Sequence, residues 1–127
     1  MKIKNYKPNN FILSLDLYPF DVMVSINQDL KDLKKDLKSV DINPKKFRLK
    51  STSIATTYDV GGNRTLIVFR DLANTPQDYG TISHEFFHVI ENVFFIINLP
   101  HCDESSEAWA YALAYLIKKF YLKLNEK

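Results

Sequence analysis

The sequence has little of what marks specialised classes of protein. A single cysteine, Cys102, excludes an internal disulfide, and only three glycines in 127 residues exclude a collagen-like composition. A transmembrane helix needs about eighteen or more consecutive apolar residues, and no stretch of this sequence is that long, so the sequence predicts no membrane span. The formal net charge is only +2, which argues against a nucleic-acid-binding surface.

What the sequence does have is enough apolar material for one core. Hydrophobic residues make up 46% of the chain and aromatic residues 13%, so we expect residues 1–127 to form a single domain. The basic opening residues pass at once into polar ones, and Asp16, Pro19 and Asp21 interrupt the apolar stretch that follows, unlike a secretory signal peptide. We therefore expect a cytoplasmic protein, which the single cysteine also favours.

The N-terminal half has the periodicity of two strands and a helix. Apolar residues alternate over residues 11–17 and again over 20–26, which predicts two strands with a bend at Pro19. Asn27 is expected to cap an amphipathic helix over residues 28–40, in which leucines recur at helical spacing among lysines and aspartates.

The C-terminal half predicts a hairpin and two helices. Residues 53–60 and 64–72 are rich in β-branched and aromatic residues and are separated by Gly61-Gly62-Asn63, which is typical of a β-hairpin. Thr75 followed by proline predicts the start of a long helix that runs to about Asn98. A last helix is expected over residues 103–124. The order of elements predicts an α+β domain with a small, mainly antiparallel sheet.

The order His84-Glu85-x-x-His88 lies inside the long predicted helix. Four residues of helix turn the chain by about 400° and advance it by about 6 Å, so both imidazoles project from one face and can reach one zinc ion. Zinc prefers nitrogen, sulfur and carboxylate ligands in a tetrahedron, and a catalytic site keeps one position for water. Glu85, beside the first histidine, is placed to act as general base on that water.

A zinc site needs a third protein ligand, and the sequence offers several. Metzincins carry a third histidine six residues after the second, but that position is Phe94, and Glu91 stands where their glycine would be, so that family is excluded. Glu107 follows His88 after eighteen residues. A distance of about 9 Å must be spanned by the loop between the two helices to bring Glu107 to the two histidines, which five residues can do. Glu107 is the expected ligand, and the open alternatives are His101, Glu104 and Asp103.

Further residues are expected to support this site. Apolar residues at the other positions of the helix should bury much of it and direct the histidine face at something within the protein. Glu91, one turn past His88, is suited to orient that imidazole. Tyr111, one turn past Glu107, is a candidate oxyanion donor or support for a ligand. The other candidate donors are His101, Tyr58 and Tyr115.

The substrate-binding strand can also be predicted. An extended peptide can pair with a free sheet edge beside the metal, using backbone hydrogen bonds for affinity. We expect residues 65–71, the strand just before the helix with the histidines, to be that edge. Leu66, Ile67 and Val68 would then contact the substrate.

With Glu107-Ala108 following the motif, the sequence resembles the gluzincin group of zinc metallopeptidases, in which two helices supply His, His and Glu. More closely, the block from Thr75 to Tyr115, which includes most of SSEAWAYALAYL, resembles small phage and prophage proteins regarded as zinc peptidases. The resemblance implies a minimal zincin-like fold, Zn²⁺ as cofactor and a protein or peptide as substrate. It makes His84, His88 and Glu107 the ligands and Glu85 the base.

Three functions are consistent with these features. The first is a cytoplasmic, phage-encoded, zinc-dependent peptidase. The second is a SprT-like protease associated with DNA, which would use His101 as third ligand; a basic run permits it, and the absence of a Gly-His-Gly context argues against it. The third is a non-catalytic module that zinc stabilises and that binds a partner protein. The basic run consists of Lys45, Lys46, Arg48 and Lys50.

Overall fold

The computed structural model describes residues 4–15, 18–46, 49 and 54–126. Four strands and three α-helices are formed in this part of the chain, with one short 3₁₀ turn. In chain order they are β1 (Asn9–Leu15), β2 (Phe20–Ile26), α1 (Leu30–Ser39), η1 (Pro44–Lys46), β3 (Ala55–Gly61), β4 (Arg64–Phe69), α2 (Pro76–Ile96) and α3 (Ser106–Leu124). The predicted α+β class and the predicted order of elements are confirmed.

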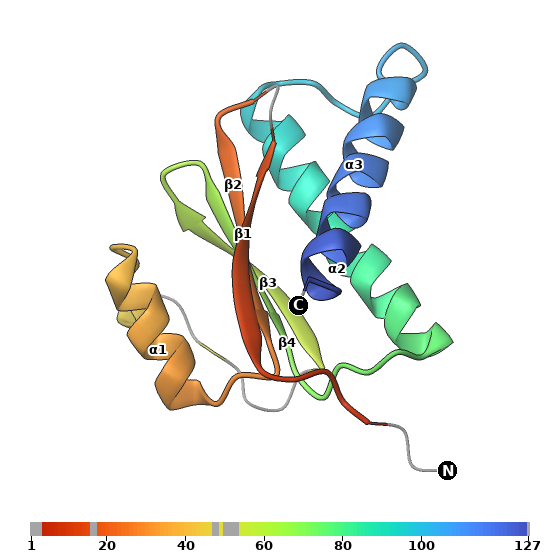
Figure 1. Ribbon diagram of the computed structural model, residues 1–127. Helices are drawn as coiled ribbons and strands as arrows, with labels where there is room; N and C mark the ends of the chain where they lie inside the picture. Colours follow the sequence, from red (N-terminus) through yellow and green to blue (C-terminus); the bar gives the residue numbers. More distant parts are fainter. Residues whose placement is uncertain (1–3, 16–17, 47–48, 50–53, 127) are drawn as a thin grey trace.

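The four strands form one mixed sheet in the order β1-β2-β4-β3. Two pairs are antiparallel, β1 with β2 and β3 with β4, while β2 and β4 run parallel. The parallel pairing follows from α1, which carries the chain across one face of the sheet between β2 and the β3–β4 hairpin. Helices α2 and α3 pack side by side on the other face (Figure 1). The sheet is therefore covered on both faces and lies between two helical layers.

Two apolar clusters divide the core according to strand alternation. In β4, Ile67 and Phe69 point toward α2 and α3, whereas Leu66 and Val68 point toward α1. This division follows because successive side chains of a strand point to opposite faces of the sheet. The larger cluster, which lies under α2 and α3, includes Phe120 of α3.

The first helix begins two residues later than expected. Asp29, not Asn27, is the N-cap of α1, and its carboxylate accepts a hydrogen bond from the backbone amide of Asp32 at 2.8 Å. The Asn27 side chain instead bonds Leu72, accepting from its amide and donating to its carbonyl oxygen, and also donates to the carbonyl oxygen of Tyr6. Asn27 therefore joins β2 to distant parts of the chain.

The helix with the histidines starts as predicted. Thr75 is the N-cap of α2, its hydroxyl accepting from the Asp78 amide at 3.1 Å, and Pro76 occupies the first turn. The last helix begins at Ser106, so Asp103 and Glu104 lie in the turn before α3 and not in its first turn.

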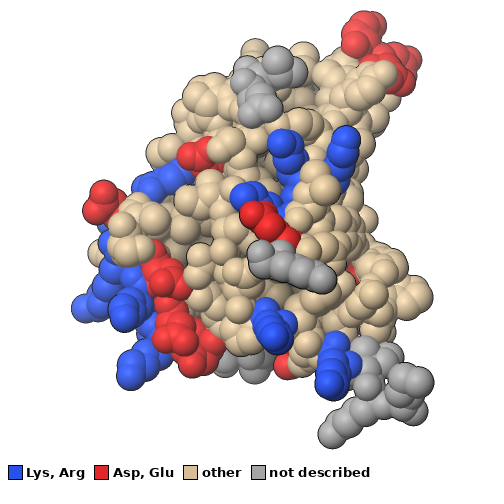
Figure 2. Space-filling model, viewed as in Figure 1, with Lys and Arg blue, Asp and Glu red and all other residues tan. Residues whose placement is uncertain are grey.

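Charge on the visible face is mixed. Basic side chains gather along the outer edge of α1 with acidic ones next to them, and further acidic side chains project at the loop that precedes α3 (Figure 2). Lys45 and Lys46, the described part of the basic run, lie in η1 beside α1. Arg48 and Lys50 lie outside the described residues. No helix among the described residues is long and apolar enough to cross a membrane.

Candidate metal and catalytic site

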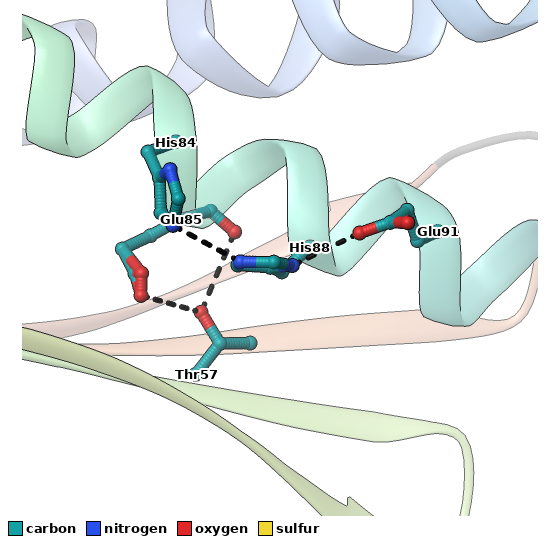
Figure 3. Close-up of polar contacts among 5 residues, drawn as sticks. All are labelled: Thr57, His84, Glu85, His88 and Glu91. Carbon is teal, nitrogen blue, oxygen red and sulfur yellow. Dashed lines mark hydrogen bonds and ion pairs between the residues drawn. The ribbon is translucent and has the colours of Figure 1, made fainter.

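Helix α2 presents His84 and His88 on one exposed face. Its buried residues follow helical spacing and face the sheet and α3; they are Ile82, Glu85, Phe86, Val89, Ile90, Val93 and Phe94. The two histidines fall between these positions and lie in the exposed class, so the expectation that they face the protein interior is wrong. Their Nε2 atoms nevertheless lie only 3.1 Å apart (Figure 3).

Glu91 contacts one ring nitrogen of His88. Its Oε1 lies 2.9 Å from Nδ1 of His88, so the expected contact between these two residues is present. A carboxylate accepts hydrogen bonds, so Nδ1 carries the proton, and in the neutral imidazole Nε2 keeps its lone pair. Nε2 of His88 lies close to Nε2 of His84, so these are the two atoms that would bind a metal ion shared by the rings.

The spacing of the pair can be compared with that of a zinc site. Zinc–nitrogen bonds of about 2.0–2.1 Å at the tetrahedral angle place two nitrogens about 3.3–3.4 Å apart. The observed Nε2–Nε2 distance of 3.1 Å is within a few tenths of an ångström of this value. A hydrogen bond from one ring to the other explains the distance equally well. The distance between the two Nε2 atoms is therefore compatible both with a shared metal ion and with a hydrogen bond between the rings.

Glu85 lies beside the pair but points toward the sheet. Its side chain is 5% exposed, and its Oε1 lies 3.4 Å from the hydroxyl of Thr57 on β3 (Figure 3). A groove of about 490 Å³ runs past this carboxylate, between the start of β3 and the first half of α2. His84 and Glu85 line this groove, so a candidate metal ligand and the candidate base both border a space that a substrate can enter.

The predicted substrate strand is the wrong one. Strand β4 is central, between β2 and β3, and the expected contact residues Leu66, Ile67 and Val68 are fully buried. The edge beside the histidines is β3, which contacts α2. Thr57, the β3 residue that touches Glu85, was not among the predicted site residues.

The backbone of β3 offers hydrogen bonds at this edge. The amide of Arg70 donates to the carbonyl oxygen of Ile54 at 2.8 Å, which makes these two residues a hydrogen-bonded pair. In an antiparallel ladder such pairs alternate with pairs whose backbone groups point outward. In the observed register, Ala55 and Thr57 therefore direct their amides and carbonyls away from β4. A peptide can add to the sheet there.

The structure does not bring Glu107 to the histidine pair. Glu107 lies nine residues before the buried Leu116, which at about 100° per residue places it on the opposite side of α3. It is exposed, and among the described residues no group of three His, Cys, Asp or Glu side chains can hold a metal ion. Its assignment as the third ligand stays a prediction.

The alternative ligands lie in or next to the loop between α2 and α3. His101 lines the same groove as His88, with its ring 5.0 Å from that of Trp109. Hydrogen bonds from its own backbone and from Cys102 lower the pKa of Glu104, which is held locally. Asp103 is exposed in the same turn. Of these residues, His101 is the one that shares a groove with the pair.

The predicted oxyanion donor is also remote from the pair. Tyr111 is 73% exposed on the outer face of α3. Tyr58 packs with the cluster on the α1 side of the sheet, opposite the histidines. Tyr115 packs against the cluster under α2 and α3.

Two tyrosines with shifted pKa values lie elsewhere. Burial, helped by the neighbouring Tyr79 and Asp78, raises the pKa of Tyr121 to about 12 and also raises that of Tyr6. These groups surround the first turns of α2, and the rings of Tyr79 and Tyr121 stack edge to face at 5.9 Å. The contact joins the start of α2 to the end of α3 and is structural.

No protein-family model, curated protein or solved structure matches this chain. Inferences about its function therefore depend on the site itself.

Proposed function

We propose that the protein is a zinc-dependent peptidase whose metal ion is held by His84 and His88. The observation that carries the proposal is the convergence of two Nε2 atoms at 3.1 Å, with Glu91 fixing the tautomer of one ring. Glu85 lies next to them at the wall of a groove. A zinc ion held by these residues would polarise the carbonyl of the substrate and lower the pKa of a bound water.

The side chains and the edge strand have separate tasks in this proposal. Glu85 accepts a proton from the attacking water and returns it to the leaving amine. Thr57, at 3.4 Å, keeps the carboxylate beside β3. The outward backbone groups of Ala55 and Thr57 hold the substrate as an added strand, which aligns the peptide bond along the groove.

The edge-strand role predicts an effect of proline at position 55. Ala55→Pro removes an outward amide without removing a bond to β4, so the fold and bound zinc should be retained. We expect kcat/KM for peptide cleavage to fall by about 2- to 10-fold, the effect of one hydrogen bond. Ala55→Val keeps the amide and is the matched control. Equal loss in both variants, or no loss in either, would show that β3 does not bind the substrate backbone.

The third ligand can be identified by competition with a zinc chelator. The sequence predicts that Glu107→Ala lowers zinc affinity, although α3 would have to turn or shift to deliver this carboxylate. His101 lines the same groove as His88, so the structure instead favours His101→Ala as the variant that lowers zinc affinity. Asp103→Ala and Glu104→Ala test the two remaining alternatives, which lie in the same exposed turn. Unchanged affinity in Glu107→Ala would remove it from the site.

A non-catalytic zinc-stabilised module is the second candidate function. It is favoured by the position of Tyr111, the predicted oxyanion donor, which is 73% exposed on the outer face of α3 and not beside the pair. Zinc that raises the melting temperature, with no cleavage of peptides or denatured protein, would support it over the peptidase. A DNA-associated protease is less favoured, because Lys45 and Lys46 lie beside α1, across the sheet from the histidines.

A further inference from the structure

The histidine face of α2 continues past the site to an exposed aromatic residue. His84, His88, Glu91 and Phe95 are spaced by four, three and four residues, so they form one stripe along the helix. Phe95 is 84% exposed, more than any other large apolar side chain in the described part of the chain. A single exposed apolar residue is common on protein surfaces, so the groove beside Phe95 carries the argument.

A second groove lies beside this stripe. It has a volume of about 660 Å³ and extends from the histidine pair to the start of α3. It reaches the pair at His88, which lines it together with Glu91. Its walls include His88, Glu91, Phe95, Leu99, His101 and Trp109.

Trp109 forms a fixed wall of the groove. Its indole Nε1 donates to the carbonyl oxygen of Leu99 at 3.1 Å. Its ring lies 5.1 Å from that of Phe94 and 5.9 Å from that of Phe87, in tilted or edge-to-face contacts. A ring held in this way on three sides is preorganised to stack with a ligand.

We propose that this groove binds an aromatic side chain of the peptide substrate close to the cleaved bond. The inference rests on the proposed peptidase function and names the class of substrate. Phe95 and Trp109 both line the groove and supply aromatic surface to it. The one acidic residue in the described lining is Glu91, and its carboxylate is already paired with His88. The groove therefore favours an uncharged ring over a lysine or arginine side chain.

Trp109 is the single tryptophan of the chain, so its fluorescence reports occupancy of the groove directly. The test uses zinc-loaded Glu85→Gln protein, which should bind peptides without cleaving them. An alanine-based peptide is compared with peptides that carry one phenylalanine or one lysine at successive positions. We expect phenylalanine at one position to change the Trp109 emission and to tighten binding by about 10- to 100-fold over alanine.

Two variants locate the binding. Phe95→Ser removes an exposed ring, so it should fold normally and lose most of the preference for phenylalanine. Tyr111→Ser is the control, because Tyr111 is also an exposed ring but lies on the outer face of α3. Equal affinity for the phenylalanine and alanine peptides, tighter binding of the lysine peptide, or the same loss in both variants would overturn the proposal. So would a dimer that Phe95→Ser dissociates, since a second copy would then cover the groove.

Failure of this inference can be told from failure of the peptidase proposal. If wild-type protein cleaves peptides irrespective of aromatic residues, the peptidase function stands and the groove assignment is wrong. If Trp109 responds to phenylalanine peptides that the wild type never cleaves, the groove assignment stands and the protein is a binding module.

Discussion

Replacing Glu85 with glutamine is expected to lower peptide turnover by about 10²- to 10⁴-fold while leaving the bound zinc in place. The amide has the shape of the carboxylate but cannot take a proton from water. Glu85 is 5% exposed and points to Thr57 rather than between the two Nε2 atoms, so the change should not disturb the metal. The measurement is kcat at saturating peptide, together with zinc content by elemental analysis.

Glu91→Gln is the matched control, because it removes the other carboxylate that touches the motif. Loss of the Glu91 carboxylate should weaken zinc binding by about 10- to 100-fold, because a negative charge no longer holds the proton of His88 on Nδ1. Once zinc is saturating, its kcat should stay close to that of the wild type. Full turnover in Glu85→Gln would show that Glu85 is not the general base.

Replacing Phe120 with alanine is expected to destabilise the fold by about 3–5 kcal/mol. Phe120 is completely buried, and its ring lies 5.8 Å from that of Phe11, 5.7 Å from that of Phe69 and 5.3 Å from that of Phe86. It thus joins α3 to β1, β4 and α2. Because domains of this size are stable by about 5–15 kcal/mol, the loss is a large part of the total.

Leu122 provides the control for this change. It lies two residues further along α3 and is mostly exposed, so Leu122→Ala should shift the free energy of unfolding by no more than about 0.5 kcal/mol. Urea denaturation of both variants measures the difference. Similar losses at the two positions would contradict the packing of α3 on the sheet.

Local signals predicted the elements well. Thr75 and Pro76 mark the start of α2 because a hydroxyl cap and a proline act within one turn. The cap of α1 was misplaced because Asn27 and Asp29 are both good capping residues. Asn27 has a positive φ of 54° and bonds to distant Leu72, which only the folded chain reveals.

The edge strand was misassigned although the sequence holds a signal for it. Residues 65–69, TLIVF, form a nearly continuous apolar run, as expected for a strand that is buried on both faces. Residues 55–60, ATTYDV, are more polar, as suits an edge. The rotation of α3 relative to α2 is harder to predict, because spacing fixes how far Glu107 can reach but not the direction in which it points.

Calorimetric titration of the metal-free protein with Zn²⁺ tests the histidine pair most directly. We predict one zinc ion per chain. In both His84→Ala and His88→Ala the affinity for zinc should fall by more than about 100-fold, because loss of a residue that only supports a ligand costs about 10- to 100-fold. Wild-type protein that binds no zinc, or variants that bind it as tightly as the wild type, would contradict the proposal that these two imidazoles hold a metal ion.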